Sequence, residues 1–121
     1  MNQVPEQAIE RVASYFQALA EPTRLRILNL LRQHEYNVGA LAEACGYTAA
    51  NMSRHLAVLM QQGFVKREGR GTTVYYQIAD PTIYALCDLV CDRIQQQHQS
   101  QAWPQSVITK KPSARLVRKA A

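Results

Sequence analysis

The chain has 121 residues, 47% of them hydrophobic, and a formal net charge of +5 at pH 7, which fits one globular domain of ordinary size. It has no run of about 18 apolar residues, which excludes a membrane-spanning helix, and its N-terminal segment lacks the pattern of a signal peptide. Its three cysteines have no repeated spacing, which argues against a secreted disulfide framework. We therefore expect a cytoplasmic protein that does not contact a membrane.

The positive charge is unevenly distributed along the chain. Residues 1–99 carry nine Lys or Arg and nine Asp or Glu, whereas residues 100–121 carry five basic residues and no acidic one. Since no sustained hydrophobic period follows residue 99, we predict a folded domain over 1–99 and a basic, disordered tail over 100–121. Such a tail can contact DNA nonspecifically or only be solvated, so net charge alone does not identify a partner.

Hydrophobic spacing predicts two helices in the first third of the chain. Residues 6–19 carry apolar side chains at helical intervals on one side, so this helix needs a partner for its apolar face. A second helix is expected from Pro22, which suits the first helical position, to about Gln33.

The next segment has the pattern of a helix-turn-helix. Asn37 can cap a short helix, and Gly46 is expected to end it in the left-handed conformation. Thr48 can cap a longer helix to about Gln62, which we expect to be the recognition helix. The residues expected in the core are Val38, Leu41 and Ala44 of the short helix and Met52, Leu56 and Leu59 of the long one.

Strand-forming residues replace the helical pattern after residue 63. Residues 64–67 and 72–78, with Gly69-Arg70-Gly71 between them, predict a β-hairpin with a basic tip. Asp80-Pro81 then starts a last helix to about His98. The expected fold is therefore mainly α with a small hairpin wing, a winged helix-turn-helix of order α-α-α-α-β-β-α.

The outward positions of the recognition helix are expected to be polar, because they must reach base edges in the major groove. Arg54 can make two hydrogen bonds to guanine and Asn51 two to adenine, so these are the preferred base readers. Thr48, Ser53 and His55 complete the predicted DNA-binding face of the helix. A solvated helix surface is the alternative, but the hairpin that follows favours DNA.

The predicted hairpin carries Lys66, Arg67 and Arg70, which suit a wing that binds phosphates or enters the minor groove. Charged surface residues are common, so this signal is weak without the preceding helices. Tyr75 and Tyr76 alternate across the second strand, and one of them is expected in the core.

Together, four motifs resemble the ArsR/SmtB family of metalloregulatory repressors. They are residues 19–28 (LAEPTRLRIL), residues 53–56 (SRHL), Leu59 with residues 63–65 (GFV), and residues 71–76 (GTTVYY). The resemblance implies a winged-helix homodimer, paired through its first and last helices, rather than an enzyme. It also implies that the dimer represses transcription at an imperfect inverted repeat of double-stranded DNA and leaves when an inducer binds.

The metal sites of that family are only partly matched. No thiol lies at the third-helix site, where Asn37-Val38-Gly39 stands. At the last-helix zinc site Asp80 matches one ligand, but Thr82, Arg93 and Gln96 cannot replace His and carboxylate ligands.

Cys87 and Cys91 are four residues apart and so share one face of the last helix. Together they could bind arsenite or a similar thiophilic ion as inducer, with a third ligand from the partner subunit, or react with a persulfide. A structural role stays open, because free cysteines often pack as small hydrophobes, and Cys45 is expected in the core more than in a sensor. No obligatory cofactor is expected.

Three functions remain to be weighed. The first is a repressor released by a thiol-reactive inducer, and the second is a ligand-independent DNA-binding protein with structural cysteines. The third, a thiol redox protein, is disfavoured because Cys87 and Cys91 lie within a helix, away from the helix start where the dipole would lower a thiol pKa.

Overall fold

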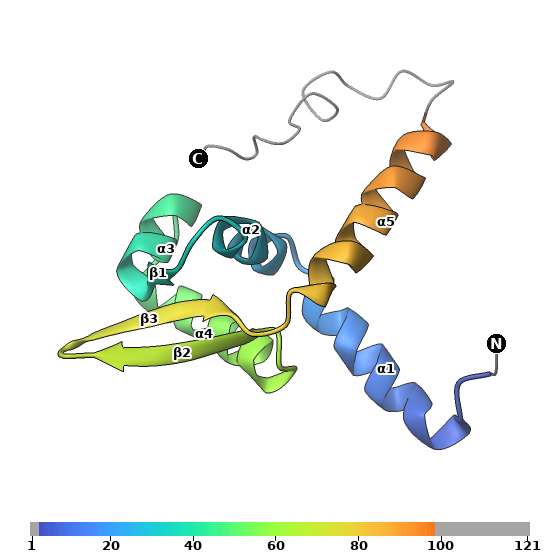
Figure 1. Cartoon of the computed structure of the whole chain (residues 1–121), viewed down its shortest axis with the longest axis horizontal. Coiled ribbons are helices and arrows are strands. Elements are labelled where there is room, and N and C mark those ends of the chain that lie inside the picture. Colours follow the sequence, from blue (N-terminus) through green and yellow to red (C-terminus); the bar gives the residue numbers. More distant parts are fainter. Residues whose placement is uncertain (1–2, 99–121) are drawn as a thin grey trace. The chain divides into compact units, whose positions relative to one another are not determined.

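The computed structural model describes residues 3–98 (Figure 1). The chain divides into two compact units after Ile78, and each is described by itself. The predicted tail over 100–121 lies outside the described residues, and its boundary stays a prediction. Within residues 3–98, no helix has both the length and the apolar character needed to cross a bilayer.

The helices of the first unit are α1 (Glu6–Leu19), α2 (Pro22–Leu31), α3 (Val38–Cys45) and α4 (Ala49–Gln61). Its strands are β1 (Tyr36–Asn37), β2 (Val65–Arg70) and β3 (Thr73–Ile78), which form an antiparallel sheet in the order β1-β3-β2. The second unit contains α5 (Thr82–Gln97). The winged helix-turn-helix fold is confirmed, with one short strand, β1, that the sequence did not predict.

The helices of the helix-turn-helix begin and end where local sequence rules place them. The Asn37 side chain accepts a hydrogen bond from the Ala40 N–H at 2.8 Å, and the Thr48 hydroxyl accepts one from the Asn51 N–H at 3.1 Å. Each satisfies a backbone donor that has no partner within its helix. Gly46 ends α3 at φ +71°, the left-handed conformation that glycine adopts without steric cost. Both caps and the glycine stop are confirmed.

The core of the first unit lies between α2, the helix-turn-helix and the sheet. Its buried side chains include Ile27, Leu28, Leu41, Met52, Leu56, Leu59, Phe64 and Tyr76. The predicted stripe of α4 is therefore confirmed, as is the burial of one tyrosine of the 75–76 pair. In α3 the prediction for Ala44 is wrong: Ala42 is buried and Ala44 exposed, because the inward face of this helix follows the spacing 38, 41, 42 and 45.

The wing is a hairpin that runs alongside α4 and whose tip projects beyond α3 (Figure 1). Its pairing runs from Val65 opposite Ile78 to Arg70 opposite Thr73, so the turn consists of Gly71 and Thr72 alone. The prediction that Gly69 and Arg70 lie in the turn is wrong. A two-residue turn is sufficient because Gly71, at φ +63°, supplies the positive φ that such turns require.

The turn between α3 and α4 gives a test of the fold. We expect Gly46→Ala to lower the free energy of unfolding by about 1–2 kcal/mol, the cost of a left-handed conformation for a residue with a Cβ. No heavy atom would meet the added Cβ within 4 Å, so the cost is conformational. The matched control is Gly39→Ala within α3, which should be neutral or stabilising by up to about 1 kcal/mol. Urea denaturation measures both, and equal stability of the two variants would contradict the account.

Candidate nucleic-acid interface

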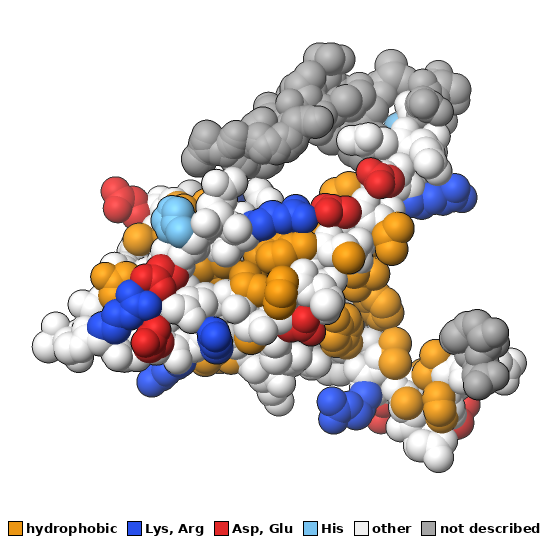
Figure 2. All heavy atoms as spheres, in the orientation of Figure 1, with side chains coloured by type: hydrophobic (Ala, Val, Ile, Leu, Met, Phe, Trp, Pro, Cys, Tyr) orange, Lys and Arg blue, Asp and Glu red, His pale blue; other side chains and the backbone are white. Residues whose placement is uncertain are grey.

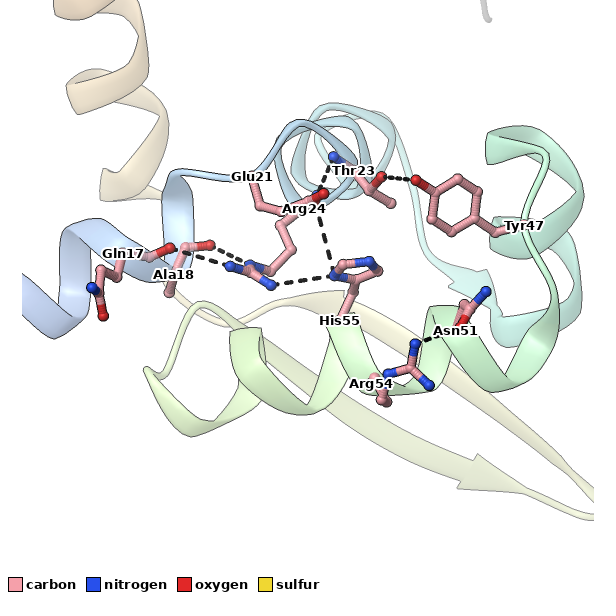
Figure 3. Close-up of polar contacts among 9 residues, drawn as sticks. All are labelled: Gln17, Ala18, Glu21, Thr23, Arg24, Tyr47, Asn51, Arg54 and His55. Carbon is pink, nitrogen blue, oxygen red and sulfur yellow. Dashed lines mark hydrogen bonds and ion pairs between the residues drawn. The ribbon is translucent and has the colours of Figure 1, made fainter.

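The outward side of α4 carries the two residues predicted to read bases. Arg54 is exposed, Asn51 is half-buried, and one Arg54 Nη2–H donates to the Asn51 Oδ1 at 2.5 Å (Figure 3). An arginine has five N–H donors, so this bond holds the guanidinium while leaving donors for a guanine edge. Ser53 and Thr48 are also exposed, and the hydroxyl of Thr48 already accepts the capping hydrogen bond.

His55 does not lie on this outward side, so its predicted outward placement is wrong. Its side chain is only 18% exposed, and its Nδ1 lies 3.3 Å from Arg24 Nη1 and 3.9 Å from Glu21 Oε1 (Figure 3). The position is three residues after Met52 and four before Leu59, which places it beside the buried stripe.

Arg24 joins three helices of the first unit (Figure 3). Its Nε donates to the Ala18 carbonyl at 2.6 Å and its Nη2 to the Gln17 carbonyl at 3.2 Å, at the end of α1. Carbonyls in the last turn of a helix lack the usual partner four residues on, and here the Gln17 carbonyl also accepts from the Ala20 N–H at 3.1 Å. The guanidinium thus connects the end of α1 and the start of α2 to His55 of α4, and we call this contact the Arg24 junction.

The other residues at the start of α2 support the same junction. Glu21 Oε1 accepts hydrogen bonds from the N–H groups of Thr23 at 2.7 Å and Arg24 at 3.1 Å. Partial burial alone would raise the pKa of Glu21, but these bonds and the nearby His55 and Arg24 lower it below its usual range. The fully buried Thr23 bonds through its hydroxyl to the Tyr47 hydroxyl at 2.8 Å, in the turn before α4. The sequence did not predict these positioning roles, although residues 21–24 lie within the family motif of residues 19–28.

The wing presents its three basic residues in different ways. Lys66 and Arg67 are exposed, and within residues 3–98 no ion pair of their side chains is found. Arg70 is paired with both Glu35 and Glu68. Hydrogen bonds from Arg70 and Gln77 hold the pKa of Glu35 below its usual range, so this carboxylate is charged at neutral pH.

The cysteines occupy different surroundings. Cys45 is half-buried, and burial raises its thiol pKa although the charge of Arg26 acts against this. On α5, Cys87 is half-buried and Cys91 is exposed, and neither is in a disulfide. The described part of the chain holds no group of three or more His, Cys, Asp or Glu side chains suited to one metal ion.

Asp80 is the single residue that matches the family's zinc ligands at the last helix. Here it bonds to a residue close to it in the chain, Thr82. Its carboxylate accepts hydrogen bonds from the Thr82 hydroxyl at 2.7 Å and the Thr82 N–H at 3.1 Å. These bonds lower the pKa of Asp80 and stabilise the start of α5.

A helix-turn-helix with a polar outer face, followed directly by a β-wing, defines a winged-helix DNA-binding protein. Residues 21–67 match the family described as bacterial regulatory protein, arsR family. The chain belongs to this ArsR family, whose members are DNA-binding transcriptional regulators rather than enzymes.

Two relatives illustrate the likeness. The HTH-type transcriptional regulator NmtR of Mycobacterium tuberculosis is 40% identical over 82 residues, which cover 68% of this chain and 68% of NmtR. A transcriptional repressor SmtB homolog of Synechocystis is 36% identical over 87 residues, covering 72% of this chain and 66% of that protein. The chain thus spans about two thirds of the length of these relatives.

A solved structure is also similar. The solution NMR structure of a homodimeric winged helix-turn-helix DNA-binding domain from Mycobacterium bovis superposes with a TM-score of 0.68 at 32% identity. The likeness covers 85% of this chain and 98% of that one.

The Arg24 junction can be tested by stability. Arg24→Met should lower the free energy of unfolding by about 1–3 kcal/mol, because it leaves carbonyls of α1 without their charged donor. Arg26→Met, an exposed position on the same helix, is the control and should change stability by less than about 0.5 kcal/mol. Chemical denaturation at one fixed protein concentration compares them, and equal small effects would show that the junction does not stabilise the fold.

Proposed function

We propose that this protein is a cytoplasmic, dimeric transcriptional repressor that binds an imperfect inverted repeat through α4 and is released by a thiol-reactive inducer. The observation that carries DNA recognition is the two-sided character of α4. One side is completely buried through Met52, Leu56 and Leu59, while the other holds Arg54 against Asn51. A rigid helix with an oriented guanidinium on its outer side suits entry into the major groove.

The DNA contacts divide into two kinds. Arg54 reads guanine, while Asn51 orients it and bonds a neighbouring adenine through its amide. Thr48 and Ser53 lie on the same helix with hydroxyls that can bond phosphate or base edges. Lys66 and Arg67 of the wing bind phosphates, since both are exposed cations.

Dimerisation is supported by apolar side chains left uncovered on α1. Ile9, Val12 and Phe16 repeat at helical intervals and are exposed, Phe16 to 52%, and Figure 2 shows orange side chains along this helix. On α5, Leu89 is 68% exposed. Exposed apolar faces of this kind mark protein contacts, and the Mycobacterium bovis relative is homodimeric. We infer a dimer paired through α1 and α5, with its recognition helices about 34–36 Å apart, one turn of DNA.

The inducer site is proposed at Cys87 and Cys91. The two thiols stand one helical turn apart on α5, which suits a soft ion such as arsenite. In this proposal the third ligand comes from the partner subunit. Since α5 belongs to the proposed interface, ligation there would alter the spacing of the two recognition helices. Release of DNA follows from that change in spacing.

The first functional test removes the base reader. Arg54→Ala should lose the preference for the protein's own upstream promoter DNA over scrambled DNA, by about 1–3 kcal/mol for each half-site. Arg26→Ala, which removes an exposed cation from α2, should leave that preference intact. Fluorescence anisotropy of reduced protein measures both. If Arg54→Ala kept the affinity and specificity of the wild type, α4 would not be the helix that recognises the bases.

The second functional test concerns the sensor. The variant with Cys87→Ser and Cys91→Ser should bind the promoter as the wild type does but no longer be released by arsenite. Cys45→Ser, at the half-buried thiol of α3, is the control and should keep the response. A normal arsenite response in the double variant would show that Cys87 and Cys91 only pack.

A further inference from the structure

Five side chains interact on one face of the wing: Glu35, Glu68, Arg70, Tyr75 and Gln77, which we call the wing cluster. Glu68 lies opposite Tyr75 in the pairing of β2 with β3, and alternate residues of a strand share a face. Arg70 and Gln77 therefore lie on the same face as that pair. Glu35 joins them from the position just before β1, and red and blue side chains lie close together near the wing in Figure 2.

Arg70 is held from several directions at once. Its Nη1 and Nη2 donate to the two carboxylate oxygens of Glu35, the second at 2.7 Å, and Nη2 also donates to Glu68 at 2.9 Å. Its Cζ lies 4.7 Å from the centre of the Tyr75 ring. Gln77 Nε2 donates to both carboxylates, at 2.8 and 3.2 Å. Single exposed ion pairs contribute little, but a forked pair within such a network has a fixed geometry.

We propose that Arg70 is a positioning residue of the wing, anchored by Glu35, and is not a phosphate contact. This inference rests on the proposed function, because it assigns different roles to the basic residues of the proposed DNA-binding surface. Two carboxylates surround the Arg70 guanidinium, so its charge is already compensated within the protein and its attraction to phosphate is reduced. Phosphate binding by the wing then depends on Lys66 and Arg67, both exposed.

The anchor connects the wing to the start of the helix-turn-helix. Glu35 is followed by β1, which pairs with β3 at Tyr36 opposite Tyr76 and Asn37 opposite Tyr75. Asn37 is also the residue that caps α3. The Glu35–Arg70 bond therefore fixes the outer end of β2 to the segment that begins α3. Loss of the bond would let the wing move relative to α4, so that phosphates and bases could not be contacted together.

The test compares the salt dependence of promoter binding among four proteins: wild type, Lys66→Gln, Arg70→Gln and Arg70→Lys. Lys66→Gln should flatten the plot of log affinity against log salt by about 0.9 for each phosphate that the variant no longer neutralises. Arg70→Gln should keep the wild-type slope but bind about tenfold more weakly, because the wing is then no longer fixed relative to α4. Arg70→Lys should weaken binding as much, because an ammonium group lacks the planar fork.

The outcomes separate the two proposals. Wild-type protein that does not prefer its promoter would defeat the proposed function itself. Specific wild-type binding, with Arg70→Gln flattening the slope as Lys66→Gln does, would make Arg70 a phosphate contact and overturn the inference. Wild-type affinity in Arg70→Lys would also overturn it, because positioning requires the fork.

Glu35→Gln gives an independent arm of the same test. It should weaken binding although it removes a negative charge, and adding Arg70→Gln to it should cause no further loss of affinity, as expected for two residues that act as one unit. Tighter binding by Glu35→Gln would mean that this carboxylate competes with DNA for Arg70, which contradicts the proposal. Unfolding curves of each variant, recorded beside the binding data, check that the fold is retained.

Discussion

The Arg24 guanidinium bonds to backbone carbonyls of Gln17 and Ala18 at the end of α1 and to the His55 imidazole of α4. This contact fixes the direction of the recognition helix relative to α1, because it bonds the end of α1 directly to a side chain of α4. Two further contacts also hold α1 in place: a hydrogen bond of 3.0 Å from Gln62 to Ser14, and the edge contact of Tyr15 with Phe64. If α1 pairs two subunits, this contact relates the recognition helix to the dimer axis.

Local sequence rules were sufficient for most of the helix-turn-helix. The caps at Asn37 and Thr48, the glycine stop and the buried stripe of α4 depend only on neighbours within one or two helical turns. The strand β1 could not be predicted, because two residues are too few to show a period of two. The wing turn was misplaced because glycines at both 69 and 71 suit a turn, and only the pairing of β2 with β3 distinguishes them.

Side chains whose partners lie far along the chain were beyond such rules. In the sequence, His55 looks like one more polar residue on an exposed helix. Its partner Arg24 is 31 positions away, so local spacing gives no sign of the contact. Arg70 reads as a basic wing residue, but it pairs with Glu35 at a separation of 35. In both cases a polar residue suited to DNA contact is bonded within the protein. Under the proposed function, DNA is contacted instead by the exposed cations Arg54, Lys66 and Arg67 of the recognition helix and wing.

The near-neutral charge of residues 1–99 bears on how such a regulator can leave DNA. Electrostatic attraction to phosphate is insensitive to base sequence and to small movements, whereas paired insertion of two helices depends on their spacing. A protein that depends on a few well-placed contacts can be released by a small change at its dimer interface. The proposed thiol site on α5 would act in this way.

The most direct measurement of the central claim is protection of the promoter DNA from methylation by dimethyl sulfate, which attacks guanine N7 in the major groove and adenine N3 in the minor groove. The account predicts two groups of protected guanines, about 10 base pairs apart, with one group for each recognition helix. Protection should depend on Arg54. A complex that leaves every guanine N7 reactive, or that protects only adenine N3, would contradict recognition of the major groove by α4.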